Sequence, residues 1–383
     1  MNNIKFANPV KILFGKGMIP EINKEIPKNK KVMILYGGGS IKKNGVYDQV
    51  KTALFEYHWV EFSGLEANPH YETCTKAVKK IRAEKVDFLL AVGGGSVIDA
   101  TKFIAAAACY QGDAWDLMIE KAPIDAALPF GTVLTLPATG SEMNMGFVIT
   151  KAATQEKLAM DSFHTLPQFS VLDPETTFTL PPVQTANGII DTFVHITEQY
   201  LTYNQHALVQ DYFAEALLKV LVEEGHKVLQ QPHNYDIRAN LMWASTWALN
   251  NWISQGVVAD WATHIIGHEL TAFHGIDHGK TLAIVLPGVL KRERTKKADK
   301  IIQMGKNVFG ITEGTRDELI DKTIDTMEKF FNSLGIQTHL SDYGVDESTI
   351  SKIALRMKER NWILGENQDI DYTAVAEILH DRI

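Results

Sequence analysis

The chain has 383 residues, with 38 Lys plus Arg against 46 Asp plus Glu, and a net charge of −8 at pH 7. This length is sufficient for two or three domains with substantial cores. Apolar residues at 45% and charged residues at 22% are typical of a globular protein. An acidic chain without a basic face is a poor match for phosphate backbones, so nucleic-acid binding is not expected. The densest basic stretch, residues 291–297, is expected to be a solvated helix surface.

Neither the N-terminus nor the interior predicts a membrane segment. The first five residues lack the apolar core of a signal peptide. No uncharged apolar stretch reaches the roughly 18 residues that a membrane helix needs. Cys74 and Cys109 are expected to be reduced thiols, with a structural disulfide as the alternative. We therefore expect a cytoplasmic protein.

The first part of the chain alternates short strand patterns with helical patterns. Apolar runs at 32–36, 88–92 and 132–136 predict buried strands, and residues 71–84 and 97–109 predict helices between them. Such alternation is typical of a parallel α/β sheet. After Leu180-Pro181-Pro182 the strand patterns nearly vanish. Amphipathic helices are then predicted at 189–201, 212–224, 240–253 and 317–334. We therefore predict an α/β domain over 1–180 and an all-helical domain over 181–383.

Two predicted strands run directly into glycine loops. The first loop is Gly37-Gly38-Gly39-Ser40 and the second is Gly93-Gly94-Gly95-Ser96. Glycines allow backbone N–H groups to approach an anion, and a following helix N-terminus adds positive potential. Neither loop has the G-x-G-x-x-G dinucleotide fingerprint or the P-loop pattern. The loops therefore indicate phosphate binding without naming the ligand, and a tight turn with no ligand is the alternative.

Acidic and histidine side chains recur at helical spacing in the second part of the chain. Asp191 and His195 are four residues apart and share a helix face, and His264 and His268 repeat the interval. His274 and His278 follow. Aspartate and histidine suit Fe²⁺ or Zn²⁺, although a hydrogen-bonded core pair is the alternative for Asp191 and His195. Spacing does not select the ligands, because any two of the four later histidines could complete the set. The H-E-x-x-H and G-x-S-x-G patterns are absent.

These motifs, taken in order, resemble the iron-containing (group III) alcohol dehydrogenase family, and within it the branch of butanol dehydrogenases and NADPH-dependent aldehyde reductases. The resemblance spans essentially the whole chain. Its motifs are Ile12-Leu13-Phe14-Gly15-Lys16-Gly17, Gly93 to Ser96 with Asp99, Thr139-Gly140-Ser141-Glu142, Asp191-x₃-His195, His264-x₃-His268, His278-Gly279 and Thr338 to Gly344.

The resemblance implies a dinucleotide-binding α/β domain, an all-helical metal domain and an active site in the cleft between them. It assigns the metal ligands to Asp191, His195, His264 and His278. His268 then matches a catalytic histidine close to the nicotinamide, and His274 would lie near the substrate. Many relatives have proline where this chain has Asp277.

The resemblance also implies a cofactor site. The matching positions are Gly94, Gly95, Ser96 and Asp99 for the pyrophosphate, the first loop Gly37, Gly38, Gly39 and Ser40, and the further contacts Asn68, Thr135, Asn144, Lys157 and Thr179. NAD-preferring relatives carry an aspartate near the place of Gly38, where it would repel a 2′-phosphate. This chain has glycine there, with Lys42 and Lys43 beyond, so NADP(H) is expected.

The implied activity is metal-dependent hydride transfer between NADPH and the carbonyl of short-to-medium-chain aldehydes. The metal is Fe²⁺ or Zn²⁺, and a homodimer is expected. A glycerol dehydrogenase or a dehydroquinate-synthase-like lyase is the alternative enzyme, and an NADP-binding or metal-storage protein is the non-enzymatic one. Phe147, Trp252, Trp261 and Phe273 are candidates for an apolar pocket, although such residues more often pack in a core.

Overall fold

The computed structural model describes residues 1–383, which form two compact units. The α/β unit comprises Ala7–Leu180 and His233–Thr246, and the helical unit comprises Met1–Phe6, Pro181–Pro232 and Trp247–Ile383. This division differs from the predicted one in two segments. Residues 1–6 belong to the helical unit, and residues 233–246 belong to the α/β unit.

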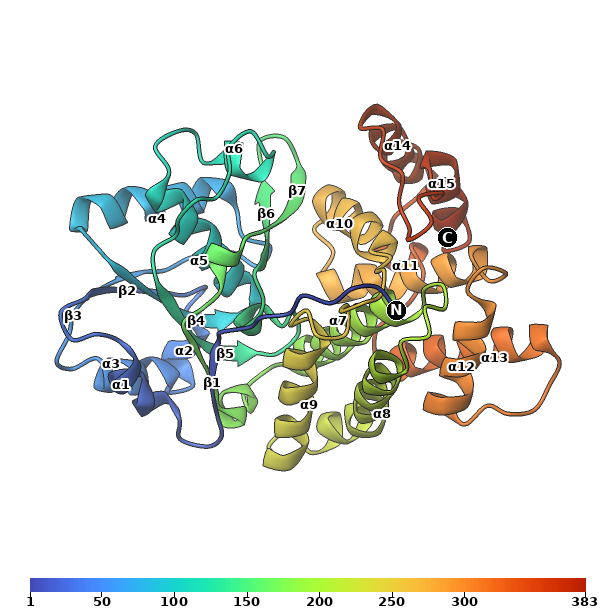
Figure 1. Ribbon diagram of the computed structural model, residues 1–383, viewed down its shortest axis with the longest axis horizontal. Coiled ribbons are helices and arrows are strands. Elements are labelled where there is room, and N and C mark those ends of the chain that lie inside the picture. The colour runs from blue at the N-terminus through green and yellow to red at the C-terminus, as the bar shows by residue number, and fades with distance from the viewer. The chain divides into compact units, whose positions relative to one another are not determined.

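The α/β unit is built on a parallel sheet (Figure 1). Its six strands lie in the order β1-β8-β5-β4-β2-β3, and β6 and β7 form a separate antiparallel pair. The strands are β1 (Lys11–Phe14), β2 (Lys31–Leu35), β3 (His58–Phe62), β4 (Phe88–Gly94), β5 (Phe130–Leu136), β6 (Gly146–Lys151), β7 (Glu156–Asp161) and β8 (Phe169–Leu172). The helices are α1 (Ile22–Glu25), α2 (Ser40–Lys43), α3 (Val46–Ala53), α4 (Tyr71–Glu84), α5 (Gly95–Cys109), α6 (Trp115–Met118) and, for most of its length, α9 (Tyr235–Ala248).

Both faces of this sheet are buried, which explains why its strands are continuous apolar runs. Met33 and Leu35 pack into one core with side chains of α4 and α5. Val32 and Ile34 point to the other face and pack with side chains of α1 and α3. The three predicted strands and the parallel α/β class are confirmed.

The helical unit contains no strand, and its only β-type pairing is an isolated bridge between Leu364 and Ile370. Its helices are α7 (Pro182–Tyr200), α8 (Leu208–Gln230), α10 (Ala262–His274), α11 (His278–Arg292), α12 (Ala298–Phe309), α13 (Arg316–Ser333), α14 (Glu347–Glu359) and α15 (Tyr372–His380). The predicted all-helical character is confirmed. None of the helices combines the length and apolar character needed to cross a membrane.

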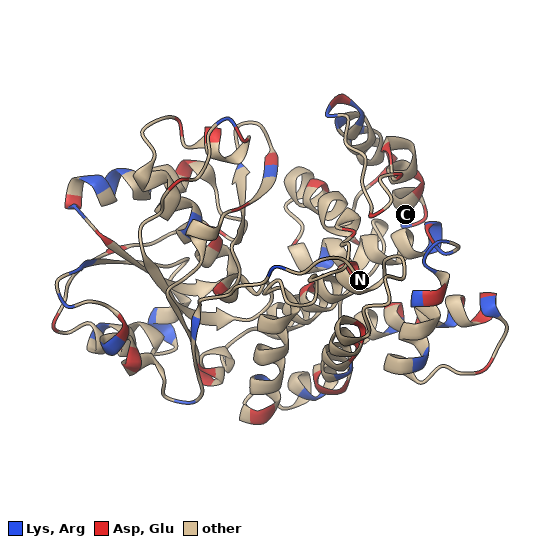
Figure 2. Cartoon of the chain, in the orientation of Figure 1, with Lys and Arg blue, Asp and Glu red and all other residues tan.

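Charged residues of both signs are interspersed over each unit (Figure 2). The prediction of a solvated surface over residues 291–297 is wrong in part. Glu293 and Lys297 are buried, because Lys297 enters a cluster of carboxylates instead of facing water. Both cysteines are free thiols, with Cys74 buried and Cys109 exposed.

Candidate functional site

Helix α7 carries a stripe of polar side chains although it is buried on all sides. Every residue from Thr185 to Tyr200 is buried. Asn187, Asp191, His195 and Glu198 follow one another at intervals of four, four and three residues, which places them on one helix face. Buried polar groups are costly unless they are bonded, so this face requires polar partners from neighbouring helices.

The start of α11 approaches this stripe closely. A Cβ on Gly279 would lie 2.6 Å from the backbone oxygen of Asn187, so glycine is required where the two helices meet. The Asn187 side chain donates a hydrogen bond of 3.2 Å to Asp277 Oδ2. This crossing brings His278 Nε2 to 3.6 Å from Asp191 Oδ1.

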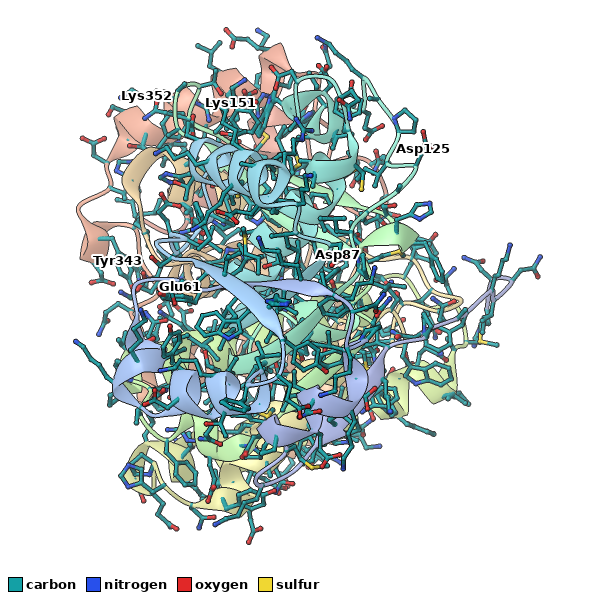
Figure 3. All side chains as sticks on the ribbon, turned by 90° about the vertical axis from the view of Figure 1, so that its left-hand side faces the viewer. Glu61, Asp87, Asp125, Lys151, Tyr343 and Lys352 are labelled. Carbon is teal, nitrogen blue, oxygen red and sulfur yellow. The ribbon has the colours of Figure 1, made fainter.

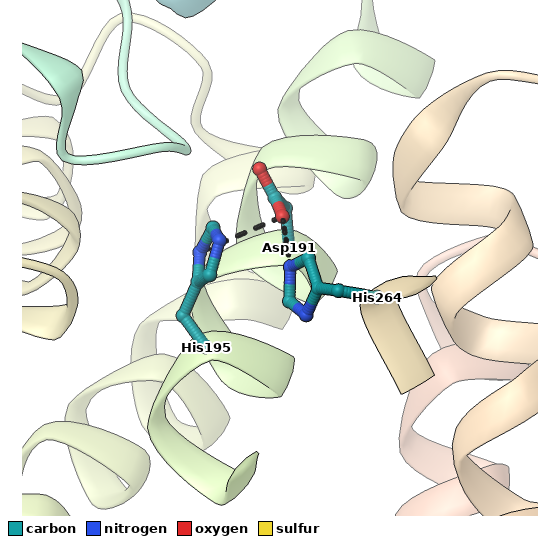
Figure 4. Close-up of side chains that lie close together, drawn as sticks. All are labelled: Asp191, His195 and His264. Atoms are coloured by element: carbon teal, nitrogen blue, oxygen red, sulfur yellow. Dashed lines mark ion pairs between the residues drawn. The ribbon is translucent and has the colours of Figure 1, made fainter. Parts of the chain in front are cut away.

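Asp191, His195 and His264 converge from α7 and α10 (Figure 4). One ligand atom from each lies within 4.8 Å of the others. His195 Nδ1 is 3.5 Å and His264 Nε2 is 3.6 Å from Asp191 Oδ1. The side chain of His278 is 22% exposed against 5% for Asp191. Three of the predicted ligands thus lie together, and the fourth, His278, lies beside Asp191 and is the most exposed of the four.

The donor atoms of this cluster fit a divalent metal. Asp191 Oδ1 and His264 Nε2 are buried and have no hydrogen-bond partner. Their separation of 3.6 Å exceeds a normal N–H···O distance. A cation bound between them would satisfy both atoms, and carboxylate plus imidazole is a donor set for Fe²⁺ or Zn²⁺.

Electrostatics within the cluster favour a charged aspartate. Burial alone would raise the pKa of Asp191, but the surrounding imidazoles of His195, His278 and His264 hold it below its usual value. Burial would lower the pKa of His264, but the carboxylates of Glu198 and Asp191 outweigh burial and raise it to about 9. A metal cation would take the place of the proton that these carboxylates attract.

Glu198, which the sequence analysis did not single out, anchors His264. Its Oε2 pairs with His264 Nδ1, and its Oε1 accepts the Thr263 N–H at 2.6 Å and the His264 N–H at 3.4 Å. A carboxylate on Nδ1 sets the tautomer that leaves Nε2 available as a ligand. The spacing of Asp191, His195 and Glu198 on one helix face could have identified it.

His268 lies beside the proposed ligands, whereas His274 lies at the other end of α10. The His268 ring lies one turn after His264 on α10, with its centroid 5.1 Å from that of His278. His274, which is expected near the substrate, is exposed in the last turn of α10, and its Nε2 is 2.9 Å from Thr349 Oγ1. The hydrogen bond to α14 gives His274 a local structural role.

The glycine loops occupy the topological switch point of the sheet. β2 pairs in parallel with β3 on one side and with β4 on the other. The strands after β2 are therefore added first on one side of it and then on the other, and the strand order reverses between β2 and β4. Gly37–Ser40 follows β2, and Gly93–Ser96 spans the last residues of β4 and the first residues of α5. In open parallel sheets, ligands bind outside the carboxyl ends of the strands at this point.

The two loops use glycine for different reasons. A Cβ on Gly95 would lie 2.4 Å from Thr139 Oγ1, and one on Gly94 would lie 2.9 Å from the Leu136 Cβ. These glycines let the start of α5 pack against the segment that follows β5. By contrast, Gly38 and Gly39 face open space, with no atom within 4 Å of an added Cβ.

The other predicted cofactor residues also belong to the α/β unit. Asn68 has a left-handed φ of 57°, its N–H lies 3.4 Å from Ser96 Oγ, and its side chain accepts the Lys157 ammonium at 2.9 Å. Thr135 lies near the end of β5, and the Thr179 hydroxyl accepts a hydrogen bond from Asn44.

Asp99 and Asn144 are held by the protein itself. Both Asp99 oxygens are engaged, one by the Ser141 hydroxyl at 2.6 Å and one by the Val148 N–H at 3.0 Å. Asn144 Oδ1 accepts the buried Lys102 ammonium at 2.8 Å. Burial lowers the pKa of Lys102 to about 7. Asp99 therefore shapes the 139–148 segment, and Lys102 orients Asn144.

Of the candidate pocket aromatics, only Trp261 contacts the metal cluster. Its ring centroid lies 5.5 Å from that of His264 and 6.4 Å from that of His195. Phe147 is fully buried in the core of the α/β unit. The remaining two pack elsewhere, Trp252 against Phe6 and Phe213, and Phe273 beneath Arg356.

Family models and related sequences match nearly the whole length of the chain. Residues 9–174 match the family model described as iron-containing alcohol dehydrogenase, and residues 185–383 match that of the C-terminal part of the Fe-containing alcohol dehydrogenase family. The chain is 53% identical over 97% of both chains to the NADPH-dependent aldehyde reductase YqhD of Escherichia coli. It is 40% identical to the NADP-dependent alcohol dehydrogenase 3 of Entamoeba histolytica, over 100% of this chain and 99% of that one.

Solved structures give the same result. A structure of E. coli YqhD superposes with a TM-score of 0.98 at 51% identity, covering 100% of this chain and 99% of that one. The NADH-dependent butanol dehydrogenase A of Thermotoga maritima superposes with a TM-score of 0.95 at 40% identity, with the same coverage. The chain belongs to the iron-containing alcohol dehydrogenase family.

Proposed function

We propose that this protein is a metal-dependent, NADP(H)-linked alcohol dehydrogenase that reduces short-to-medium-chain aldehydes. The observation that carries the proposal is the convergence of Asp191, His195 and His264 in the helical unit, with His278 Nε2 3.6 Å from Asp191 Oδ1. The similarity to an NADPH-dependent aldehyde reductase at 53% identity supports the substrate class.

Asp191, His195, His264 and His278 would hold one divalent ion. A bound metal of this kind polarises a carbonyl oxygen as a Lewis acid and stabilises negative charge on it. The same donors accept Fe²⁺ and Zn²⁺, so either ion fits the proposal. Elemental analysis of protein purified without added metal distinguishes them.

The first glycine loop supports NADP(H) as the cofactor. Residues 37–40 carry no acidic side chain, and Lys42 and Lys43 follow directly. The nearby carboxylate of Glu61 on β3 (Figure 3) accepts the Tyr47 hydroxyl at 2.5 Å, and its Oε1 lies 3.6 Å from Lys42 Nζ. Because the Lys42 ammonium offsets the charge of Glu61, a 2′-phosphate would meet little repulsion.

His268 is our candidate for moving the proton to the alkoxide product. It is buried beside His264 and His278, and an imidazole can exchange a proton near neutral pH. His268→Ala is expected to slow turnover and change its pH profile, with metal content unchanged. A pH profile identical to that of the wild type would exclude this role.

A substrate and cofactor panel tests the proposal. NADPH oxidation is followed with acetaldehyde, butyraldehyde and hexanal, with NADH in parallel, and glycerol oxidation with NAD⁺ covers the glycerol dehydrogenase alternative. We expect aldehyde reduction that prefers NADPH. Equal or better rates with NADH would contradict the cofactor assignment, and turnover of glycerol alone would contradict the substrate class.

We further propose a homodimer in a reducing, cytoplasmic location. Leu208, Val209 and Tyr212 share one face of the first turns of α8 and are 58%, 63% and 61% exposed, which is unusual for a cluster of large apolar side chains. Light scattering is expected to give twice the chain mass of 42.8 kDa, and Leu208→Asp is expected to reduce it. The free thiols of Cys74 and Cys109 support the location.

A further inference from the structure

A buried cluster of charges lies beside the end of α7, just before the beginnings of α10 and α12 in the chain. Lys297 Nζ is 2.9 Å from Asp260 Oδ2 and 2.7 Å from Glu366 Oε1, and it donates to the Leu201 carbonyl at 2.7 Å. The side chains of Lys297, Asp260 and Glu366 are 2%, 4% and 3% exposed. We call these three residues the Lys297 cluster. Burying such charges is costly, and replacement by apolar residues is often neutral or stabilising. The cost of burying these three charges therefore indicates a role other than stability.

The cluster joins α7 and α10, two of the three helices that carry residues of the proposed metal site. Leu201, whose carbonyl Lys297 binds, is the residue at which α7 ends. Asp260 donates its N–H to the Glu198 carbonyl at 2.8 Å, in the last turn of the same helix. Asp260 Oδ1 also accepts the N–H of Ala262, the first residue of α10, at 3.0 Å. Lys297 thus ties the end of α7 to the beginning of α10.

Between the cluster and the metal site stands a residue in an unusual conformation. Trp261 has φ 65° and ψ 2°, in the left-handed region. A bulky residue rarely adopts this conformation, which costs on the order of 1–3 kcal/mol and persists only where its surroundings enforce it. Asp260 supplies such enforcement, because both its backbone and its side chain are bonded on either side of this turn.

The strained turn places the indole ring against two metal-site histidines. The Trp261 ring meets those of His195 and His264 edge to face, at interplanar angles of 66° and 75°. His195 and His264 themselves stack, with centroids 4.5 Å apart. A change in the backbone at 260–261 would release this ring and loosen both imidazoles.

We propose that Lys297, Asp260 and Glu366 are positioning residues of the metal site, which act through the strained turn at Trp261 to hold His195 and His264 in place. The inference rests on the proposed function in taking these histidines as metal ligands. It adds residues that bond to none of the four proposed ligands directly.

The test compares Lys297→Met with Lys300→Met. Lys300 is a suitable control because it lies in the first turn of α12 and forms an equally buried ion pair, with Asp211 at 2.5 Å. Its ion pair joins α12 to α8, and its Nζ also lies 4.9 Å from the ring centroid of Tyr200 at the end of α7, but it bonds neither Asp260 nor α10. Each variant is titrated with Co²⁺ and Zn²⁺ without NADPH or aldehyde. The readouts are the dissociation constant, the visible absorption of bound Co²⁺ and the melting temperature.

Lys297→Met is expected to weaken metal binding roughly 10- to 100-fold and to alter the Co²⁺ spectrum, as observed when groups that orient metal ligands are removed. Lys300→Met is expected to lower the melting temperature while the metal affinity and spectrum remain those of the wild type. Wild-type affinity and spectrum in Lys297→Met, or equal weakening in both variants, would overturn the inference.

Glu366→Gln keeps the side-chain shape and the Lys297–Asp260 pair, so it provides the test if Lys297→Met does not fold. It is expected to change the Co²⁺ spectrum and to weaken binding several-fold, and an unchanged spectrum would overturn the inference. The two proposals fail differently. Wild-type protein that binds no metal contradicts the proposed function, whereas wild-type binding in both cluster variants contradicts only the role of the Lys297 cluster.

Discussion

Replacing Glu198 by glutamine is expected to damage the metal site while preserving its shape. In the wild type, Glu198 Oε1 accepts the Thr263 N–H and Oε2 pairs with His264 Nδ1. Glutamine retains one acceptor oxygen and replaces the other by an NH₂ donor. If its oxygen stays with Thr263, the NH₂ faces His264 Nδ1, which must then accept. The ring proton moves to Nε2, the atom that faces Asp191.

The size of the effect follows from the weaker hydrogen bond that glutamine would make to His264. A hydrogen bond to a charged group contributes about 1.5–3 kcal/mol and a neutral one about 0.5–1.5 kcal/mol. The difference of about 1–2 kcal/mol corresponds to a reduction in affinity of roughly 5- to 30-fold, and the change of tautomer adds to it. We therefore expect Glu198→Gln to weaken Zn²⁺ binding at the upper end of the roughly 10- to 100-fold range for such partners.

Competition with a chromogenic chelator measures this affinity directly. Glu215→Gln is the matched control, because Glu215 is a buried glutamate of the same unit that accepts the Tyr200 hydroxyl at 2.8 Å. It is expected to retain wild-type affinity. If Glu198→Gln bound Zn²⁺ as tightly as the wild type, the assignment of His264 Nε2 as a ligand held in its tautomer by Glu198 would be refuted.

Three further predictions concern the α/β unit. Gly38→Asp adds a carboxylate in open space, where it would repel a 2′-phosphate. The KM for NADPH is expected to rise at least about 10-fold and the KM for NADH to change little. An equal rise for both cofactors would argue against a 2′-phosphate at this loop. Gly95→Ala places a Cβ 2.4 Å from Thr139 Oγ1 and is expected to cost about 1–3 kcal/mol in the free energy of unfolding, while Gly38→Ala has little effect in the same urea titrations. The pKa of Lys102 is about 7 in the folded protein, against an ordinary value of 10.5. Between these two pH values the unfolded chain therefore binds one more proton than the folded protein. The free energy of unfolding rises with pH over this range, by at most about 5 kcal/mol. Lys102→Met should abolish this rise in urea unfolding measured from pH 7 to 10, and an unchanged pH dependence would show that another group causes it.

The sequence was most informative where function requires a periodic pattern. The i, i+4 spacing of Asp191 and His195 predicts that both side chains reach one point, and the structure brings them there with His264. The strand-to-glycine transitions at Gly37 and Gly93 mark the carboxyl ends of adjacent strands. These patterns can be recognised in the sequence because each lies within or directly after one helix or strand.

What the sequence did not predict depends on contacts between distant segments. Lys297 stands in a run of charges that favours a solvated surface, and only the meeting of Asp260 and Glu366 makes its burial possible. His274 has the same residue type as the proposed ligands, but it lies at the far end of α10 and bonds Thr349. The short strands β1, β3 and β8 gain stability from pairing within the sheet and carry weak patterns of their own.

The most direct test of the account is the rate of butyraldehyde reduction by NADPH as a function of bound metal. The protein is stripped of metal, reloaded separately with Fe²⁺ or Zn²⁺, and compared with Asp191→Ala treated in the same way. We predict no turnover in the stripped protein, recovery with at least one of the two ions, and no recovery in Asp191→Ala. Full activity in the stripped protein, or recovery in Asp191→Ala equal to that of the wild type, would contradict the proposal that this cluster is the catalytic metal site.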